Sequence, residues 1–577
     1  MSGRFHRADS GALRIWSDEQ KADFLAKGWW SEATFDSMLR GHVDEHPDRV
    51  IHVDPPNRAA FFNGEPVRLT WREIDAKVDL LAAHLLAVGV GPGDVVGIQL
   101  PNVHELSVSY LATARLGAIA SPFPVQYREH ELTTLGNVAG LKAFVTATTI
   151  AGRANAAAIE ALRTSGAIPS LAVVLAYGEE VPAGIVALDH DARPDPAALS
   201  AHVERHRPDP ADCVTLCWTS GTESTPKGVP RSSGDWLNGF WTTIDAPTLT
   251  ETDVILNPFP MVNMGGIAGM FGPWLVTGCR LVQHQPFDLG LFIDQIETER
   301  VTYSVAPPTV LTMMLKNDAL LAGRDISSLR FLASGSAPLT SWMINGWERD
   351  RGVEVINFFG SNEGLCLVGD ADSVPNPDDR AVYFPRFGAS GMTFRARHAK
   401  WTKVRIVHLE TGEDITEPGI PGELRLSGPT VFPGYWGGVG EPFDEQGYYR
   451  SGDVFELAGD RLQYVRYVDR VKDLIIRGGM NIAPAEIEGV LASHPLVAES
   501  VAVAWPDERL GERVCVFVAL RDGIDPTALT LADVSDHFAA ERVAKFKWPE
   551  RLEIVDALPR NPVGKVLKRE LRDRIAT

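Results

Sequence analysis

The chain contains little cysteine, and the few cysteines show no functional spacing. Only five of its 577 residues are cysteine, and they are scattered without the separations of metal ligands or of a disulfide framework. Cys213 and Cys217 lie two pleats apart on a predicted strand, so we interpret them as buried thiols rather than as reactive groups. This pattern fits a reducing compartment, and we expect a cytoplasmic protein.

Positive charge is also in deficit. The chain has 55 basic and 75 acidic residues, which gives a formal net charge of −20. Nucleic acids and anionic membrane surfaces are polyanions, so neither is expected to be the main partner. The first nine residues are polar and lack the apolar core of a signal peptide.

One long stretch, residues 254–279, carries no charge. Pro258, Pro260 and Pro273 make it unsuitable as a continuous membrane-spanning helix, because proline breaks helices. We interpret the stretch as a buried helix that lines an apolar tunnel, and we expect no integral membrane segment.

The length of the chain and its periodicity predict several domains. A chain of 577 residues exceeds what one hydrophobic core usually organises. Residues 70–73 form a capping box before an amphipathic helix, and residues 95–100 are a continuous apolar run typical of a buried strand. Such helices and strands alternate to about residue 345, which predicts an α/β fold with stacked, mainly parallel sheets. Short strands then indicate a β-rich subdomain over about 395–469, and residues 470–577 a small α+β domain.

The segment from Trp218 to Val229 carries the strongest local signal. Its small, hydroxylated and glycine residues follow an apolar strand and end in Lys227. Glycines let a backbone approach an anion, while N–H groups, hydroxyls and a lysine can bind phosphate. The GxxxxGK[ST] spacing of a Walker loop is absent, and Pro226 precedes the lysine. We predict a polyphosphate-binding loop here, with a solvated turn as the alternative.

Further motifs follow at characteristic separations. They are Phe359–Glu363, Gly422–Leu424, Tyr449–Asp453, Asp469–Asp473, Arg477–Ile482 and Pro559–Lys565. In this order they resemble the adenylate-forming superfamily of acyl-CoA synthetases, aryl-acid and peptide-synthetase adenylation domains and firefly luciferase. The resemblance runs from about Trp29 to the C-terminus. It implies that ATP and a carboxylic acid give acyl-AMP and pyrophosphate, and that the thiol of CoA then displaces AMP. It also implies an N-terminal adenylation domain, 1–469, and a mobile C-terminal domain, 470–577.

The resemblance assigns a set of residues to ATP. They are Thr219, Ser220, Gly221, Thr222, Lys227, Gly335, Ser336, Ala337, Pro338, Phe359, Gly360, Asn362, Asp453 and Arg470. Phe359 would stack on adenine, Asp453 would bind the ribose hydroxyls, and Arg470 would donate to the ribose or a phosphate. Read without the family, Phe359 is a core residue and the two charges belong to ordinary turns.

Three residues are implied as catalytic: Lys565, Glu363 and Thr219. Lys565 would bridge the incoming carboxylate and the phosphate, because two anions must be brought together. Glu363 would bind Mg²⁺, whose preferred ligands are oxygens. Taken by themselves, Lys565 is a solvated surface lysine and Glu363 a capping or surface glutamate.

The acid and CoA are implied to bind elsewhere. Met261, Val262, Met264 and Gly265 match the acid pocket of the superfamily, with core methionines as the alternative. They offer no carboxylate for an α-amine, and a buried ammonium without a counter-ion would be costly. We therefore expect an apolar acid rather than an amino acid. The resemblance also disfavours a catechol-type acid, because the His-Asn pair that aryl-acid members align with a dihydroxybenzoate ring falls on Met261 and Val262. Lys472 would be the hinge, and Gly478 and Gly479 would line the CoA path.

Two residues depart from the superfamily pattern. Glu223 and Ser224 replace the usual Thr and Gly, and a carboxylate near phosphates weakens ATP binding unless it points outward or pairs with Arg231. A non-catalytic nucleotide-binding protein is therefore one alternative. Another is a ligase that loads the phosphopantetheine arm of a separate carrier protein. The oligomeric state stays open.

Overall fold

The computed structural model describes residues 5–188, 194–219, 226–335, 338–478, 480–507, 509–560 and 566–575. These residues form two compact units. The first unit draws on 1–219, 225–403 and 427–442, and the second on 404–426 and 443–577. The functional boundary between residues 469 and 470 stays a prediction.

Two large sheets form the centre of the first unit. The seven-stranded sheet has the order β11 (Gly228–Ser232), β10 (Cys213–Trp218), β6 (Ile119–Pro122), β5 (Val95–Ile98), β7 (Leu141–Ala147), β8 (Val173–Tyr177) and β9 (Val186–Ala187). The eight-stranded sheet has the order β17 (Gly364–Gly369), β16 (Glu354–Ser361), β15 (Phe331–Gly335), β14 (Tyr303–Val305), β12 (Val254–Asn257), β13 (Arg280–Gln283), β3 (Val50–Val53) and β4 (Arg68–Thr70). Most neighbouring strands are parallel, and the antiparallel pairs are β10/β11, β16/β17 and β3/β4. The predicted α/β fold with mainly parallel sheets is confirmed.

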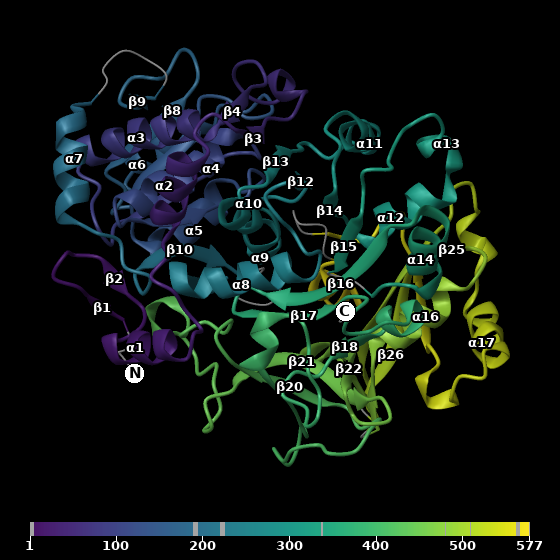
Figure 1. Cartoon of the computed structure of the whole chain (residues 1–577). Helices are drawn as coiled ribbons and strands as arrows, with labels where there is room; N and C mark the ends of the chain where they lie inside the picture. The colour runs from purple at the N-terminus through teal and green to yellow at the C-terminus, as the bar shows by residue number, and fades with distance from the viewer. Residues whose placement is uncertain are drawn as a thin grey trace. The chain divides into compact units, whose positions relative to one another are not determined.

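Helices cover these sheets (Figure 1). They are α2 (Phe35–Glu45), α3 (Trp71–Ala87), α4 (His104–Arg115), α5 (Glu129–Ala139), α6 (Asn155–Thr164), α7 (Pro196–Arg205), α8 (Ser233–Asp245), α9 (Met264–Gly266), α10 (Gly272–Thr277), α11 (Leu289–Thr298), α12 (Pro308–Lys316), α13 (Asp318–Leu321), α14 (Ser341–Asn345) and α15 (Pro377–Arg380). The capping box predicted at Thr70 and Glu73 begins α3. All residues of α4 are buried, so this helix belongs to the core.

The charge-free stretch 254–279 is not one helix. It begins as strand β12, which pairs with β13 and β14, and only from Met264 does it become helical. The helical part includes a π-turn at Ile267–Phe271 before α10. The strand and most residues of the helical part are buried, which explains the absence of charge without a membrane. The prediction of a buried helix therefore holds only for the second half.

The N-terminal segment is tied to the first unit by polar contacts. It contains β1 (His6–Arg7), β2 (Leu13–Arg14) and α1 (Asp18–Ala26). Arg14 and Lys21 form ion pairs with Asp209, and the Trp16 indole donates to the carboxylate of buried Asp235, 2.9 Å away. Asp235 also caps α8 through Ser232, so the segment supports the start of that helix.

The second unit contains two smaller sheets. One is antiparallel and includes β20 (Gly422–Ser427), β21 (Tyr449–Ala458) and β22 (Tyr464–Arg470), with β19 (Lys403–Val407) beside β20. The other consists of β24 (Met480–Ile482), β23 (Ile475–Arg477), β26 (Gly511–Leu520), β25 (Val497–Asp507) and β27 (Arg551–Ile554). Helices α16 (Pro484–Ala492), α17 (Leu531–Ala540) and α18 (Lys568–Ile575) complete the unit. The short strand β18 (Tyr383–Pro385) belongs to the first unit.

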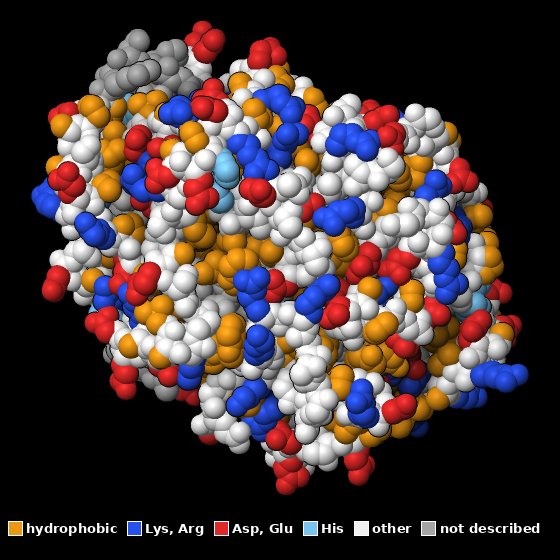
Figure 2. Space-filling model, viewed as in Figure 1, with side chains coloured by type: hydrophobic (Ala, Val, Ile, Leu, Met, Phe, Trp, Pro, Cys, Tyr) orange, Lys and Arg blue, Asp and Glu red, His pale blue; other side chains and the backbone are white. Residues whose placement is uncertain are grey.

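Within the described ranges, no helix is both long and apolar enough to cross a membrane. Acidic and basic side chains are interspersed over the face seen in Figure 2. Cys213, Cys217, Cys279 and Cys515 are buried, as predicted for the first two, and burial raises the pKa of Cys217 to about 12.

Candidate functional site

The predicted phosphate loop spans the turn of the β10/β11 hairpin. Trp218 pairs with Gly228 in the strand register, and Thr219 follows β10 directly. The Thr219 amide donates to the Lys227 carbonyl at 3.0 Å, and the Lys227 amide donates to Thr219 Oγ1 at 2.9 Å. Thr219 and Lys227 therefore close the loop at its base. The ATP-assigned residues Ser220, Gly221 and Thr222 lie outside the described residues, as do Glu223 and Ser224.

Asn362 joins this hairpin to the predicted acid segment. It lies in the turn between β16 and β17, where Ser361 pairs with Gly364. Its Nδ2 donates to the Trp218 carbonyl at 2.8 Å, and its Oδ1 accepts from the Met264 amide at 2.8 Å. One amide side chain thus contacts the strand before the phosphate loop and the first turn of α9.

Arg231 donates hydrogen bonds to the backbone of the same turn. Its side chain is only 1% exposed, because it extends from β11 into the core. Nε and Nη2 donate to the Asn362 carbonyl at 3.2 and 2.9 Å, and Nη1 donates to the Thr430 carbonyl at 2.9 Å. Arg231 thus donates to two backbone carbonyls, and its predicted pairing with Glu223 concerns a residue outside the described ones.

Glu363 is 8% exposed and contacts a residue that the sequence did not single out. The Tyr435 hydroxyl donates to Glu363 Oε1 at 2.9 Å, and Lys227 Nζ lies 4.6 Å from the centre of the Tyr435 ring. No basic side chain in the described part of the chain forms an ion pair with Glu363. Among the described residues, this carboxylate environment is compatible with the prediction that Glu363 binds Mg²⁺.

The residues assigned to adenine lie at the ends of β15 and β16. Gly335 pairs with Phe358, and a Cβ at Gly335 would lie 2.3 Å from the Phe358 carbonyl oxygen, so this position requires glycine. Phe359 is half-buried with its ring centre 6.0 Å from that of Phe384, and the exposed Gly360 follows it. Pro338 is exposed. Ser336 and Ala337 lie outside the described residues.

The predicted acid-pocket residues differ in exposure. Met261 is fully buried, Val262 and Met264 are buried, and Gly265 is exposed. The Met261 carbonyl accepts from the Tyr110 hydroxyl at 2.5 Å, and its sulfur lies 3.8 Å from the Gln283 amide nitrogen. These contacts fix Met261 within the core, and a role in the pocket stays a prediction.

In the second unit, two residues assigned to ATP meet across neighbouring strands. Asp453 on β21 pairs in register with Arg470 on β22, and Arg470 Nε lies 3.1 Å from Asp453 Oδ1. Asp453 is 5% exposed, whereas the Arg470 side chain is about a third exposed at 32%.

The predicted hinge and CoA-path residues lie in turns. Lys472 is exposed in a 3₁₀ turn, Val471–Asp473, directly after β22. Gly478, with a φ of 59°, begins the turn between β23 and β24, and its amide donates to the Leu510 carbonyl at 2.7 Å. Gly479 and Lys565 lie outside the described residues.

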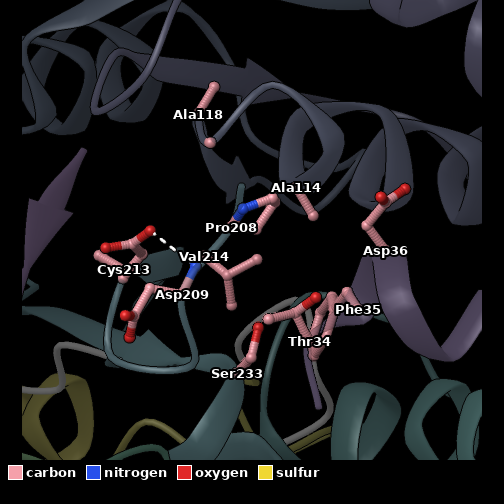
Figure 3. A pocket seen from close by; sticks show the side chains of 12 residues that line it. Thr34, Phe35, Asp36, Ala114, Ala118, Pro208, Asp209, Cys213, Val214 and Ser233 are labelled. Atoms are coloured by element: carbon pink, nitrogen blue, oxygen red, sulfur yellow. Dashed lines mark hydrogen bonds between the residues drawn. The ribbon is translucent and has the colours of Figure 1, made fainter. Parts of the chain in front are cut away.

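Two other features of the first unit are not part of this site. Asp54, His104 and Glu105 have the mutual geometry of metal ligands, but the Arg58 guanidinium pairs with both carboxylates and supplies their positive charge. A small cavity near Asp209 and Cys213, shown in Figure 3, has room for about one water molecule.

The mainly parallel α/β fold, with predicted phosphate-loop, glutamate and acid-segment residues close together in the first unit, is the arrangement expected of an adenylate-forming enzyme. The chain belongs to the AMP-binding enzyme family: the family model matches residues 39–436, and that of the AMP-binding enzyme C-terminal domain matches residues 486–565. The chain is thus an AMP-forming acid–thiol ligase of the acyl-CoA synthetase class.

Individual relatives align over nearly their whole length. A medium-chain fatty-acid–CoA ligase of Escherichia coli is 29% identical over 99% of this chain and 95% of its own. An indoleacetate–CoA ligase of Aromatoleum aromaticum is 30% identical over 92% of this chain and 98% of its own. The crystal structure of ATP-bound MatB from Rhodopseudomonas palustris matches with a TM-score of 0.76 and 26% identity, over 95% of this chain and 99% of MatB.

Proposed function

We propose that the protein activates an apolar carboxylic acid, medium-chain, alicyclic or aromatic, through an acyl-adenylate and transfers the acyl group to CoA. The observation that carries this proposal is the double contact of Asn362. It holds the strand before the phosphate loop and the apolar segment at Met264 together, so an acid bound there would lie beside the nucleotide phosphates. Met261, Val262 and Met264 offer no charge, and the relatives named above act on a medium-chain fatty acid and on indoleacetate.

Each predicted site residue has a proposed role toward one part of the substrates. Thr219 and Lys227 would bind phosphate oxygens, and Lys565 would neutralise the reacting carboxylate and phosphate. Glu363 would hold Mg²⁺, which supplies positive charge to the phosphates of ATP. Asp453 and Arg470 would bind the ribose, with Phe359, Gly360 and the backbone from Gly335 to Pro338 at the adenine.

Thioester formation requires a second arrangement of the small domain. Lys565 would leave after adenylation so that Gly478 and Gly479 can line the path of the CoA thiol, with Lys472 as the pivot. The exposure of Lys472 in a short turn supports this role. Lys472→Pro should slow acyl transfer to CoA while pyrophosphate release stays normal. If both half-reactions proceed at the wild-type rate, the hinge lies elsewhere.

The overall proposal is tested by ATP-dependent pyrophosphate release with aromatic, alicyclic and C4 to C16 aliphatic acids, each with and without CoA. We expect release with a subset of apolar acids, stimulation by CoA, formation of AMP and a thioester, and loss of activity in Lys565→Ala. Release that ignores CoA would favour a carrier protein as acceptor. Absence of release with every acid would favour a non-catalytic nucleotide-binding protein.

A further inference from the structure

Tyr435 contacts two residues that the proposed function assigns to ATP. Its hydroxyl donates to Glu363 Oε1 at 2.9 Å. Its ring lies beneath the Lys227 ammonium, with Nζ 4.6 Å from the ring centre. Glu363 is the proposed Mg²⁺ ligand, and Lys227 is the last residue of the predicted phosphate loop. The Tyr435 side chain therefore contacts both an acidic and a basic residue of the proposed site.

The residues beside Tyr435 anchor it firmly. The Phe432 amide donates to the Glu363 carbonyl at 2.8 Å, and the Phe432 ring packs edge-on against that of Tyr435 at 4.8 Å. On the other side, the Trp436 indole donates to the Val138 carbonyl at 3.1 Å. A Cβ at Gly228 would lie 2.9 Å from Trp436 Cβ, so this residue packs directly on the base of the β10/β11 hairpin. The segment 432–436, which we call the Tyr435 strap, is thus fixed on both sides of the tyrosine.

A hydroxyl held in this way restricts the glutamate. A glutamate side chain has several rotamers, and ordering them costs conformational free energy that must be supplied on ligand binding unless the protein has already supplied it. The hydrogen bond fixes Oε1, and a hydrogen bond to a charged group is stronger than one between neutral groups. Oε2 is not used by the tyrosine and can face a cation.

The ring acts on the lysine. An ammonium over an aromatic face at an exposed site is attracted weakly, by about two- to fivefold in affinity, so the ring can hold Lys227 without competing with a polyphosphate. Lys227 is exposed, so the ring keeps its ammonium near Glu363 without burying it.

We propose that Tyr435 is a positioning residue for adenylation: its hydroxyl orients Glu363 for the metal of Mg–ATP, and its ring holds Lys227 until the phosphates bind it. This inference rests on the proposed function, because the roles of Glu363 and Lys227 do.

Two substitutions separate the hydroxyl from the ring. Tyr435→Phe keeps the ring, and we expect the kcat of pyrophosphate release to fall about tenfold, the equivalent of one hydrogen bond to a charged group. The KM for Mg–ATP should rise by about two- to threefold, and the Mg²⁺ concentration for half-maximal rate should rise as well. Tyr435→Leu should show the same loss of kcat and raise the KM for Mg–ATP by about a further two- to fivefold, the value of the lost cation–π contact.

A matched control is Tyr448→Phe. Arg405 lies 4.7 Å from the Tyr448 ring centre, so this tyrosine also supports a cation. It belongs to the second unit and contacts none of the predicted site residues that the structure describes. Removal of the Tyr448 hydroxyl should leave kcat, the KM for ATP and the Mg²⁺ dependence unchanged.

A double-mutant cycle tests the route through Glu363. If the hydroxyl acts by orienting this carboxylate, Tyr435→Phe should have no further effect in a Glu363→Gln background, measured by ATP–pyrophosphate exchange. A full tenfold loss in that background would overturn the proposal, because the hydroxyl would then act elsewhere.

Equilibrium binding makes the test independent of turnover. Calorimetric titration with ATP should show weaker binding to Tyr435→Phe than to wild type in Mg²⁺, and equal binding in EDTA. If wild type binds Mg–ATP but releases no pyrophosphate with any acid, the proposed function fails while this comparison still decides on Tyr435. Equal binding of Mg–ATP by the two proteins would overturn the inference.

Discussion

The two units hold their predicted ATP residues in different ways. In the first unit, a buried arginine and an asparagine serve backbone carbonyls and amides; we call this group, Trp218, Arg231, Met264, Asn362 and Thr430, the Asn362 junction. In the second unit, Asp453 and Arg470 meet side chain to side chain on paired strands, with the arginine about a third exposed. Contacts to backbone fix the position of the chain itself, whereas a side-chain pair leaves both partners able to turn toward a ligand. From this comparison we expect the proposed phosphate and acid side of the site to be rigid and the proposed ribose side to be adjustable.

Arg231→Met should have the largest effect. It removes a buried guanidinium that donates three hydrogen bonds to two carbonyls, and breaking such a buried site costs about 3–5 kcal/mol. We expect this loss in the free energy of unfolding by urea, together with loss of pyrophosphate release. The control is Arg72→Met, because Arg72 is 63% exposed and pairs with an exposed aspartate. Equal effects of the two changes would refute the rigidity of the junction.

Asp453→Ala should affect ligand binding rather than folding. Loss of hydrogen bonds between a carboxylate and the ribose costs about 1.5–3 kcal/mol, so the KM for ATP should rise tenfold or more. Arg470 can turn to water, so the free energy of unfolding should change by about 1 kcal/mol or less. Asp460→Ala, in an exposed turn, is the control. A large loss of stability with an unchanged KM would place Asp453 with the structural residues.

Asn362→Ala also tests the Asn362 junction, and we expect a smaller effect than that of Arg231→Met. It removes two hydrogen bonds between neutral groups, each of about 1 kcal/mol, so kcat/KM should fall about tenfold for both ATP and acid. Asn362→Thr should recover part of this loss, since one hydroxyl can replace one of the two contacts. An effect on ATP alone, with kcat/KM for the acid unchanged, would show that the contact to Met264 does not position the acid segment.

The smallest effect concerns pH. Burial raises the pKa of Asp469, which accepts from the Arg470 and Ala485 amides beside the proposed hinge. The folded state therefore keeps this proton to a higher pH than the unfolded state, so the free energy of unfolding falls as pH rises above the ordinary aspartate value of 3.8. Asp469→Asn should reduce this slope in urea unfolding followed from pH 4 to pH 7. An identical slope in both proteins would show that Asp469 does not contribute.

The sequence predicted those features that depend on neighbours in the chain. The capping box at residues 70–73 and the buried strand at 95–98 follow from local patterns, and both are confirmed. The mixed nature of residues 254–279 was missed, because a buried parallel strand and a buried helix are equally free of charge. Pro258 and Pro260 indicated a break in the stretch, but they did not show which side of the break forms the strand.

Contacts that build the site were harder to predict. The Tyr435 hydroxyl bonds Glu363 across 72 positions, and Arg231 bonds carbonyls 131 and 199 positions away. Such pairs depend on how strands distant in the sequence assemble, and the hydrophobic periodicity of the sequence does not predict them. The aromatic pair Tyr435–Trp436 after Gly434 was the available signal, but by composition it is equally typical of core.

The contacts at the base of the β10/β11 hairpin have a consequence for engineering the predicted phosphate loop. Because Trp218 pairs with Gly228, and Thr219 and Lys227 bond one another, the sheet fixes both ends of the predicted phosphate loop. We therefore expect that a loop with Thr and Gly in place of Glu223 and Ser224 can replace the present one while β10 and β11 keep their register. If this loop binds phosphate as proposed, such an exchange would change nucleotide affinity through one short stretch of the chain.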